Sequence, residues 1–403
     1  MINRSARTAV ALLTSCLLLS ACGADGADRG TRARPAPSPT PLFAEPAARQ
    51  PQLAVEATQH SRTAAFRQTI TFGSRRGAAT QTTQGFLDFG GDRARAARVW
   101  NVPPSLPDNA GETFLGKLLH GRARVSVQEA YVDRATVAVQ PGRADYWLRF
   151  TTAVSDSTGA NAISELRGIV APFGGTLLEA VAGARSVTAR PAPGGGRVYT
   201  MRLGLKAVAD VVPGFLHAEL REVPKEYTTD APVPMTLTVD ARGRITRADA
   251  DLTVLLGRKG SALAWTTSLK ASLVLTGHGS STPPALSAGE RVLDAATAYA
   301  RLADVRPGSC ADLDSGTHQW DWVVIVPCGT SHDARIYAQL KLGGDYPGDG
   351  AVREGIDDAC REARAKAPEA WAGSAGAMYG HVSPPASSWE VEKGATTCYA
   401  IEP

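Results

Sequence analysis

Long runs of alternating apolar and polar residues fill the chain from about residue 53 to residue 280. The clearest runs place on one side Tyr146, Leu148 and Phe150, and then Met235, Leu237 and Val239. Because successive side chains of a strand point to opposite faces, a period of two predicts strands with one apolar and one polar face. Such strands favour a large antiparallel sheet with one face buried and the other in water.

Two long apolar rows follow a tight-turn signal near the end of this region. The signal is Asp240-Ala241-Arg242-Gly243, which is typical of a hairpin. The alternation after it predicts one strand over residues 248–256 and a second over residues 265–275. Both strands present one apolar side, so they extend the buried face of the sheet.

A helical insert interrupts the strands. The apolar spacing changes to three or four residues around Ile163 to Val170, breaks at Pro172–Gly175, and resumes from Leu177 to Val181. A second helical piece, interrupted by proline, is expected over residues 208–220. Apolar helices need a surface to cover, and the apolar face of the sheet is that surface. The predicted fold class is therefore α+β.

The apolar face has two interpretations that the sequence does not separate: a filled core, or a pocket for an acyl chain. A pocket would lie between the sheet and residues 163–181. Its expected lining residues are Leu166, Val170, Leu177, Leu252, Val254 and Leu273.

The N-terminus has the pattern of an export signal. Arg4 and Arg7 precede an apolar run that ends at Leu19, which is too short for a permanent membrane helix. The run is followed by Leu19-Ser20-Ala21-Cys22, which resembles the lipobox of bacterial lipoproteins. That resemblance implies cleavage after residue 21, acylation of Cys22, and attachment to membrane lipid at the extracytoplasmic face.

Residues 22–52 are expected to form an unstructured tether. The segment is rich in proline, as in Arg34-Pro35-Ala36-Pro37-Ser38-Pro39-Thr40-Pro41, and poor in apolar residues. A segment of this composition cannot bury enough apolar surface to offset the entropy of ordering. We expect it to act as an extended spacer between the anchor and the folded part.

Charge and cysteine placement exclude some functions. The formal net charge is +4, or about +2 once residues 1–21 are removed, so no concentrated basic face indicates nucleic-acid binding. After Cys16 and Cys22, the remaining cysteines are Cys310, Cys328, Cys360 and Cys398. Their spacings do not suit a metal site, and an exported compartment favours disulfides. The expected pairs are 310–328, which flank a strand, and 360–398.

The sheet region also resembles a known family. The lipobox, the curved antiparallel sheet, the helical insert after Tyr146-Trp147-Leu148-Arg149-Phe150 and the closing hairpin are similar to LolA-like half-barrel lipoproteins of actinobacterial envelopes. The resemblance covers about residues 53–280. It implies that acyl chains are held between sheet and helices.

A linker and a helix are expected over residues 281–304, with an amphipathic helix from Ala288 to Leu302. Residues 305–403 then resemble the septum-formation domain of actinobacterial membrane proteins. The resemblance rests on Arg306-Pro307-Gly308-Ser309-Cys310, on Pro327-Cys328-Gly329-Thr330-Ser331-His332-Asp333, and on Ser388-Trp389-Glu390 ahead of Cys398. Ser331 departs from the proline that is common in that family. The resemblance implies an envelope or septal protein as partner.

The sequence contains no catalytic signature, metal site or cofactor motif. His332-Asp333 lacks a nucleophile elbow, so the pair is interpreted as a turn whose side chains bond nearby backbone. The leading hypothesis is a non-catalytic envelope lipoprotein that binds lipid or lipoprotein acyl chains. The alternative is a scaffold protein at the envelope or septum.

Overall fold

The structure is a computed structural model. It describes residues 41–115, 125–133, 136–141, 144–151, 154, 171–220, 233–281, 285–313, 322–346, 348–372, 377–384 and 386–401. Residues 39–403 form one compact unit, and all of the described elements belong to it. Cys22, Leu166 and Val170 lie outside the described residues.

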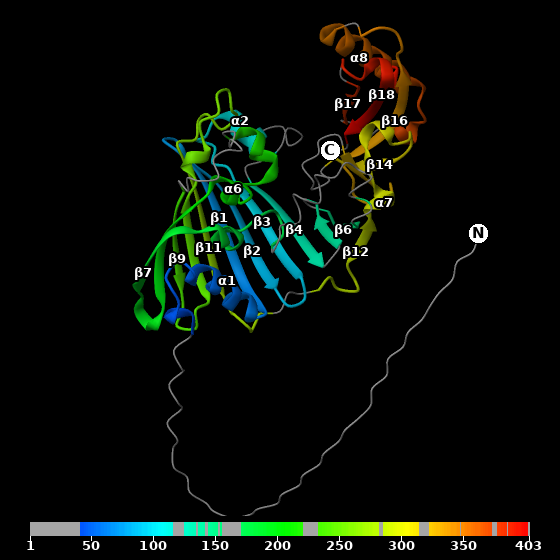
Figure 1. Ribbon diagram of the computed structural model, residues 1–403. Coiled ribbons are helices and arrows are strands. Elements are labelled where there is room, and N and C mark those ends of the chain that lie inside the picture. The colour runs from blue at the N-terminus through cyan, green and yellow to red at the C-terminus, as the bar shows by residue number, and fades with distance from the viewer. Residues whose placement is uncertain are drawn as a thin grey trace, which may run out of the picture. The chain divides into compact units, whose positions relative to one another are not determined.

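Within the described residues, the larger sheet has 12 strands in the order β12-β6-β5-β4-β3-β2-β1-β11-β10-β9-β8-β7 (Figure 1). All neighbours in it are antiparallel except β12 and β6, which are parallel. Its strands are β1 (Thr63–Ser74), β2 (Gly77–Asp88), β3 (Arg93–Asn101), β4 (Val125–Asp133), β5 (Thr136–Gln140), β6 (Tyr146–Thr151), β7 (Arg185–Pro191), β8 (Arg197–Leu203), β9 (Val233–Val239), β10 (Ile245–Asp251), β11 (Ser268–Thr276) and β12 (Arg291–Asp294).

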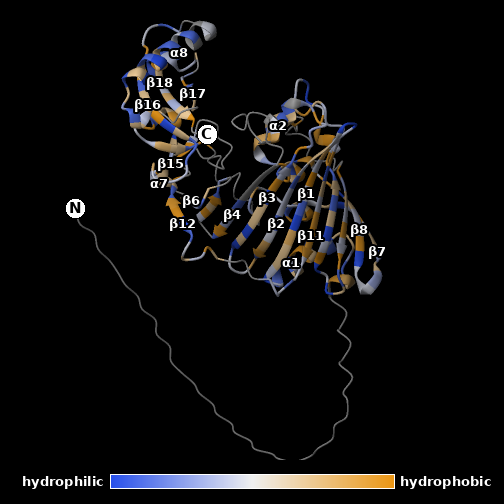
Figure 2. Ribbon diagram, turned by 180° about the vertical axis from the view of Figure 1, so that it is seen from behind, coloured by the Kyte–Doolittle hydropathy of each residue, from blue (hydrophilic) through white to orange (hydrophobic). Residues whose placement is uncertain are grey.

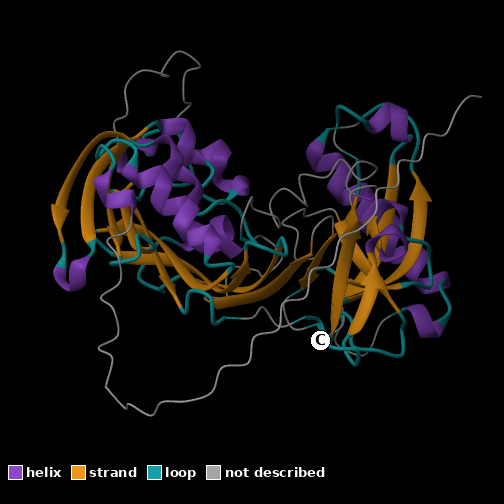
Figure 3. Cartoon of the chain, turned by 60° about the horizontal axis from the view of Figure 1, so that its bottom comes forward, coloured by secondary structure: helices purple, strands orange, loops and turns teal. Residues whose placement is uncertain are grey.

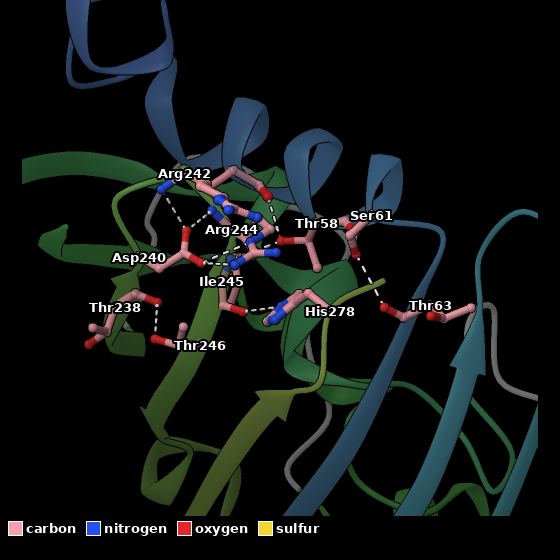
Figure 4. A network of polar contacts seen from close by, with 11 residues as sticks. Thr58, Ser61, Thr63, Thr238, Asp240, Arg242, Arg244, Ile245, Thr246 and His278 are labelled. Carbon is pink, nitrogen blue, oxygen red and sulfur yellow. Dashed lines mark hydrogen bonds and ion pairs between the residues drawn. The ribbon is translucent and has the colours of Figure 1, made fainter. Parts of the chain in front are cut away.

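The period-two prediction is confirmed in β1, β3, β8, β9 and β11. It fails in β5 and β6, where three consecutive residues are buried, and in β7, where none is buried. In β9, Val233, Met235, Leu237 and Val239 are buried and the residues between them are not. Hydrophobic and hydrophilic colours alternate along strands of the larger sheet in Figure 2. The turn before β10 also forms as expected, since Asp240 accepts hydrogen bonds from the backbone N–H groups of Arg242 and Arg244 (Figure 4). The side chain of Arg244 donates two more bonds to the same carboxylate.

Short helical pieces cover one face of the larger sheet, on its concave side (Figure 3). We call them the cover: α1 (Gln50–His60), α5 (Leu177–Ala180), η3 (Val181–Gly183), α6 (Leu205–Ala209) and η5 (Gly214–Glu219). Further short elements are η1 (Pro41–Ala44), α2 (Asp108–Leu115), η4 (Pro193–Gly195) and η6 (Thr253–Leu255). The second helical piece expected over residues 208–220 corresponds to α6 and η5, which Pro213 separates.

One expected strand is shorter than its apolar pattern. The alternation continues to Leu256, but β10 ends at Asp251 and residues 253–255 form η6. The side chain of Asp251 accepts a hydrogen bond from the N–H of Thr253, which favours a turn over continued strand pairing. Val254 therefore lies on a helical turn and not on a strand.

The smaller sheet has the order β13-β15-β14-β16-β18-β17 among the described residues. Its elements are α7 (Ala295–Ala298), β13 (Tyr299–Arg301), η7 (Leu302–Asp304), β14 (Cys310–Asp312), β15 (Trp322–Val326), β16 (Ala334–Lys341), α8 (Asp349–Lys366), η8 (Glu369–Trp371), β17 (Met378–Val382), α9 (Trp389–Glu392) and β18 (Ala395–Ile401). Disulfides join Cys310 to Cys328 and Cys360 to Cys398, which are the expected pairs. The fold is α+β, with a large curved sheet followed by a small disulfide-bearing part.

The structure differs from the expectation for residues 288–302. No single helix forms there; β12, α7 and β13 take its place. The apolar spacing fits a helix, but β12 pairs with β6 and β13 pairs with β15. The side chain of Asp294 also caps α7 by accepting a bond from the N–H of Ala296. Strand pairing with distant residues thus overrides the local pattern.

The ordered part also begins earlier than expected. The tether was expected to extend to residue 52, whereas η1 starts at Pro41 and α1 starts at Gln50. Leu42 is 5% exposed and belongs to the main core, and the side chain of Gln50 accepts hydrogen bonds from Arg197 and Tyr199 in β8. These contacts order a segment whose own composition favours disorder.

Candidate ligand site under the cover

The cover and the concave face of the sheet form one apolar core. It contains the inward-facing residues of β1, β8, β9, β10 and β11 together with the apolar side chains of α5, α6 and η5. The helix α5 contacts β10 and β11, and α1 contacts β10. The predicted partnership between helical insert and apolar sheet face is therefore confirmed for the described part of the insert.

The structure brings together the predicted lining residues that it describes. Leu177 in α5, Leu252 after β10 and Leu273 in β11 are each 1% exposed or less, and all three belong to the main core. Val254 is partly buried and packs against the same core. A side chain with so little exposure leaves no water-sized space beside it, so these residues pack as a filled core in this state.

The break expected at Pro172–Gly175 is a sharp chain reversal. Phe173 and Gly174 have φ values of 67° and 104°, in the left-handed region that is costly for Phe173. A Cβ on Gly175 would lie 2.6 Å from the carbonyl oxygen of Asp210, at the end of α6. The N–H of Gly175 donates to that same oxygen at 3.0 Å. Only glycine fits this approach between two pieces of the cover.

Gln68 of β1 joins this break to the sheet. Its side-chain Nε2 donates to the carbonyl of Gly175 at 3.0 Å, and its Oε1 accepts from the N–H of Leu177 at 3.0 Å. Gln68 is 5% exposed, so both bonds lie away from water. Thr176, between the two bonded residues, caps α5 in a capping box with Glu179. The Gln68 side chain thus holds the start of α5 against the sheet.

Gln68 belongs to a group of polar residues in an otherwise apolar face. Gln81 and Thr83 of β2 are 2% and 7% exposed, and Thr83 stands directly opposite Gln68 in the strand register. We call Gln68, Gln81 and Thr83 the polar row. It borders a cavity of about 10 Å³, whose other lining residues are Phe66, Ile70, Pro172, Phe173, Gly174, Gly175, Thr176 and Val211.

The polar row contains a buried acceptor. The Oε1 atom of Gln81 has no hydrogen-bond partner among the residues that the structure describes. A buried polar atom without a partner costs about 1–3 kcal/mol, so natural cores contain few of them. Arg98 of β3 stands opposite Thr83 in the strand register, and its guanidinium lies 4.5 Å from the centroid of the Phe173 ring. The break in the insert therefore closes over a polar part of the sheet.

Sequence reasoning missed the polar row. The available signal was parity: Gln68 occupies the inward side of β1 with Phe66 and Ile70, and Gln81 occupies the inward side of β2. A polar residue at an apolar position of a strand indicates a special environment. Two such residues on paired strands would have placed the site next to the break at residues 172–175.

A second depression, of about 470 Å³, lies on the opposite face of the sheet. Its lining is mostly polar: Thr69, Thr71, Thr200, Pro234, Met235, Thr236, Asp249, Ala250, Asp251, Lys270, Ala271 and Ser272. This is the face that the alternation predicts to be in water. Asp249 forms an ion pair with Arg247. Hydrogen bonds from Thr253 lower the pKa of the Asp251 carboxyl and outweigh the opposite effect of burial.

His332 and Asp333, the pair that the sequence analysis weighed for catalysis, both form hydrogen bonds to backbone groups. The Nδ1 atom of His332 donates to the carbonyl of Thr330 at 2.7 Å, and a carboxylate oxygen of Asp333 accepts from the N–H of Leu313 at 2.9 Å. Both side chains therefore bond backbone groups as expected, but the hydrogen-bonded turn itself lies just before them, at residues 327–330. Among the described residues, no group of three or more His, Cys, Asp or Glu side chains is placed to hold a metal ion.

No helix in the described part of the chain has the length and apolar character needed to cross a membrane.

Comparisons with known proteins gave structural similarities only. No protein-family model matches the sequence, and no curated protein matches it. LprF from Mycobacterium bovis is similar at 12% identity and a TM-score of 0.33, over 62% of this chain and 98% of that one. The Mycobacterium tuberculosis lipoprotein LppX is similar at 11% identity and a TM-score of 0.30, over 60% of this chain and 97% of that one.

A putative outer membrane lipoprotein-sorting protein domain from Vibrio parahaemolyticus is similar at 6% identity. Its TM-score is 0.18, over 56% of this chain and 91% of that one. Because these TM-scores are low, the description of the sheet, the cover and the polar row depends only on the described residues of this chain.

Proposed function

We propose that this chain is an envelope lipoprotein that is anchored through Cys22 and binds the acyl chains of a lipid or lipoprotein without catalysis. The anchor rests on the Leu19-Ser20-Ala21-Cys22 pattern. The binding function rests on one observation in the fold. The apolar face of the sheet is closed by short separate helical pieces, and the Pro172-Phe173-Gly174-Gly175 break directly precedes α5 and its N-cap.

The cover is built in a way that permits opening. The helices α5 and α6 have four and five residues, so neither is stable without its contacts to the sheet. The break at residues 172–175 is tied to its surroundings by the bonds of Gln68 and by the Gly175–Asp210 bond. Each such bond contributes about 1 kcal/mol net.

An acyl chain can offset the cost of opening. Burial of a methylene group contributes about 0.8 kcal/mol, so ten methylenes contribute about 8 kcal/mol. The inserted chain would also take over contacts that the apolar residues of α5 make with β10 and β11 in the closed state. Leu177, Leu252, Val254 and Leu273 are the described residues that we expect to meet it.

The test uses a Cys22→Ala variant of the full chain. Without the acylation site, we expect the protein to leave the membrane fraction or to remain unprocessed. Organic extraction of the purified protein, followed by mass spectrometry, should recover bound lipid. A fluorescent fatty acid should also bind with saturation.

A matched pair of substitutions locates the binding site. Val254→Trp adds bulk beside the core under the cover and should weaken the fluorescent probe at least about tenfold, which is 1.4 kcal/mol. Val391→Trp adds the same bulk at a residue of α9 that is 84% exposed, and should leave binding unchanged. A protein that carries no lipid and does not bind the probe would refute the binding function.

A second function, as a scaffold for an envelope or septal protein, has its own support. The strand β17 lies at an edge of the smaller sheet, and it exposes Met378 and Tyr379 at 57% and 39%. Exposed large apolar side chains on an edge strand are suited to a protein partner. Failure of the lipid experiment would leave this function as the better supported one.

A further inference from the structure

The polar row and its cavity carry information about which lipid the site takes. Gln68, Gln81 and Thr83 face inward on β1 and β2, where neighbouring inward positions hold Phe66, Ile70 and Ala79. A site for plain hydrocarbon would be better served by apolar residues at all of these positions. We propose that the polar row binds the linkage region of the lipid, through a hydroxyl or amide N–H next to its acyl chain. This inference rests on the proposed lipid-binding function.

The closed state shows the kind of group that the row accepts. The Gln68 amide is paired with a backbone carbonyl and a backbone N–H of the cover, at Gly175 and Leu177. If the cover moves off the sheet, these two bonds break and the Gln68 amide is left with one donor and one acceptor to satisfy. An amide or hydroxyl group of a ligand supplies both.

Gln81 indicates that the ligand should present a hydrogen-bond donor. Gln81 is 2% exposed. Its Oε1 atom is an acceptor and has no hydrogen-bond partner among the described residues. The cavity beside it, at about 10 Å³, has room for about one water molecule and not for a lipid headgroup. A ligand that donates a hydrogen bond there satisfies Gln81, whereas a ligand without a donor leaves it unsatisfied.

This assignment separates a binding role from a structural role for Gln81. A structural glutamine stabilises the ligand-free fold through its bonds, so its loss lowers stability. An acceptor kept for a ligand makes no bond to the protein in the ligand-free fold, so its loss removes no bond that stabilises that fold. We therefore expect Gln81→Met, which has a similar volume, to leave the stability of the ligand-free full chain unchanged or raised.

The binding test uses two probes of nearly equal shape. N-methyl oleamide has an amide N–H where methyl oleate has an ester oxygen, and both are uncharged. Each is delivered from cyclodextrin to the purified full chain, and its affinity is measured by displacement of a fluorescent fatty acid. The measured quantity is the ratio of the two affinities, because a ratio within one protein cancels the unequal hydration of the probes when variants are compared.

The inference predicts that Gln81→Met lowers the amide-to-ester affinity ratio about tenfold, with little effect on methyl oleate. Gln84→Met is the matched control, because Gln84 lies on the same strand and is exposed on the other face. Its ratio should equal that of the unsubstituted chain. Thr83→Val provides a second variant within the row, with a smaller loss in the same direction.

The outcomes are distinguishable. Equal ratios in the unsubstituted chain and Gln81→Met, with both probes bound, would overturn the polar-row assignment and leave the proposed lipid-binding function standing. A loss of stability in ligand-free Gln81→Met, with equal ratios, would assign Gln81 a structural role and overturn it as well. If neither probe binds the unsubstituted chain, the proposed function fails and the assignment fails with it.

Discussion

Asp312 is a partly buried carboxyl group where the two sheets meet. It belongs to β14, and it accepts a hydrogen bond of 2.5 Å from the hydroxyl of Tyr146 in β6. Burial is the largest influence and raises the pKa of Asp312 above its ordinary value of 3.8. The Tyr146 bond and His332 lower this pKa, and the nearby Asp333 raises it further.

The raised pKa predicts a pH dependence with a definite sign. Between 3.8 and the folded-state pKa, the folded chain binds more protons at Asp312 than the unfolded chain does. The contribution of Asp312 to stability is therefore complete below pH 3.8 and is lost as the pH rises through the folded-state value. Asp312→Asn removes the ionisation and keeps an acceptor for Tyr146. The free energy of unfolding of Asp312→Asn, relative to that of the unsubstituted chain, should therefore be higher at pH 7 than at pH 4.

Thermal unfolding of both proteins across this pH range checks the prediction. Asp312→Ala is the control, because it removes both the charge and the bond to Tyr146 and should cost about 1 kcal/mol at pH 4. A difference between Asp312→Asn and the unsubstituted chain that stays constant with pH would contradict the assignment.

A buried hydroxyl of the helix α1 bonds the β9–β10 hairpin. The Oγ1 atom of Thr58 donates to the carbonyl of Ala54 at 2.7 Å within the helix, and accepts from the N–H of Ile245 at 2.8 Å (Figure 4). Thr58 is 0% exposed. The Nε2 atom of His278, which follows β11, donates to the carbonyl of Ile245 at 2.9 Å. Both backbone groups of Ile245 are thus satisfied by side chains from other elements.

Removal of that hydroxyl should loosen α1 from the sheet. Thr58→Val keeps the shape of the side chain but leaves the N–H of Ile245 buried without its partner, which should lower the free energy of unfolding by about 1–3 kcal/mol. Thr58→Ser keeps the hydroxyl and should lose less. Urea unfolding of the three proteins measures the effect, and equal losses for valine and serine would show that packing of the methyl group is what matters.

The two sheets share a core, which joins them more firmly than a linker would. It combines residues of β4, β5 and β6 with residues of α7, β13, β14 and β15. Phe150 of β6 and Tyr299 of β13 lie with ring centroids 5.2 Å apart, and Tyr299 stacks on Trp322 of β15 at 4.6 Å. Because β12 also pairs with β6, residues 291–301 connect the sheets through strand pairing at both ends.

A substitution on one side of this core should therefore be felt on the other. Phe150 is 0% exposed, and Phe150→Ala should cost about 3–5 kcal/mol. We expect hydrogen exchange to show lost protection in β15 as well as in β5 and β6, because the shared core unfolds as one unit. Lost protection confined to β5 and β6 would show that the two sheets unfold independently.

Patterns that act over a few residues were sufficient for much of this fold. The period of two in β9 and the Asp240–Gly243 turn specify their own conformation, because backbone geometry places their side chains. The disulfide pairs could also be predicted, since an exported compartment favours disulfides and Cys310 and Cys328 flank a predicted strand, which leaves Cys360 for Cys398. For the site, the same patterns placed Leu177, Leu252 and Leu273 on one apolar face.

Contacts between distant residues settled the remainder. Residues 288–302 have helical spacing, yet β6 and β15 offer backbone partners that turn parts of the segment into strands. Gln50 and Leu42 are ordered by β8 and the main core. The filled state of the apolar face and the polar row beside Gly175 depend on side chains more than a hundred residues apart, such as Gln68 and Leu177. A sequence pattern indicates the period of each element but not which elements lie beside it. Burial and hydrogen bonding depend on those neighbouring elements.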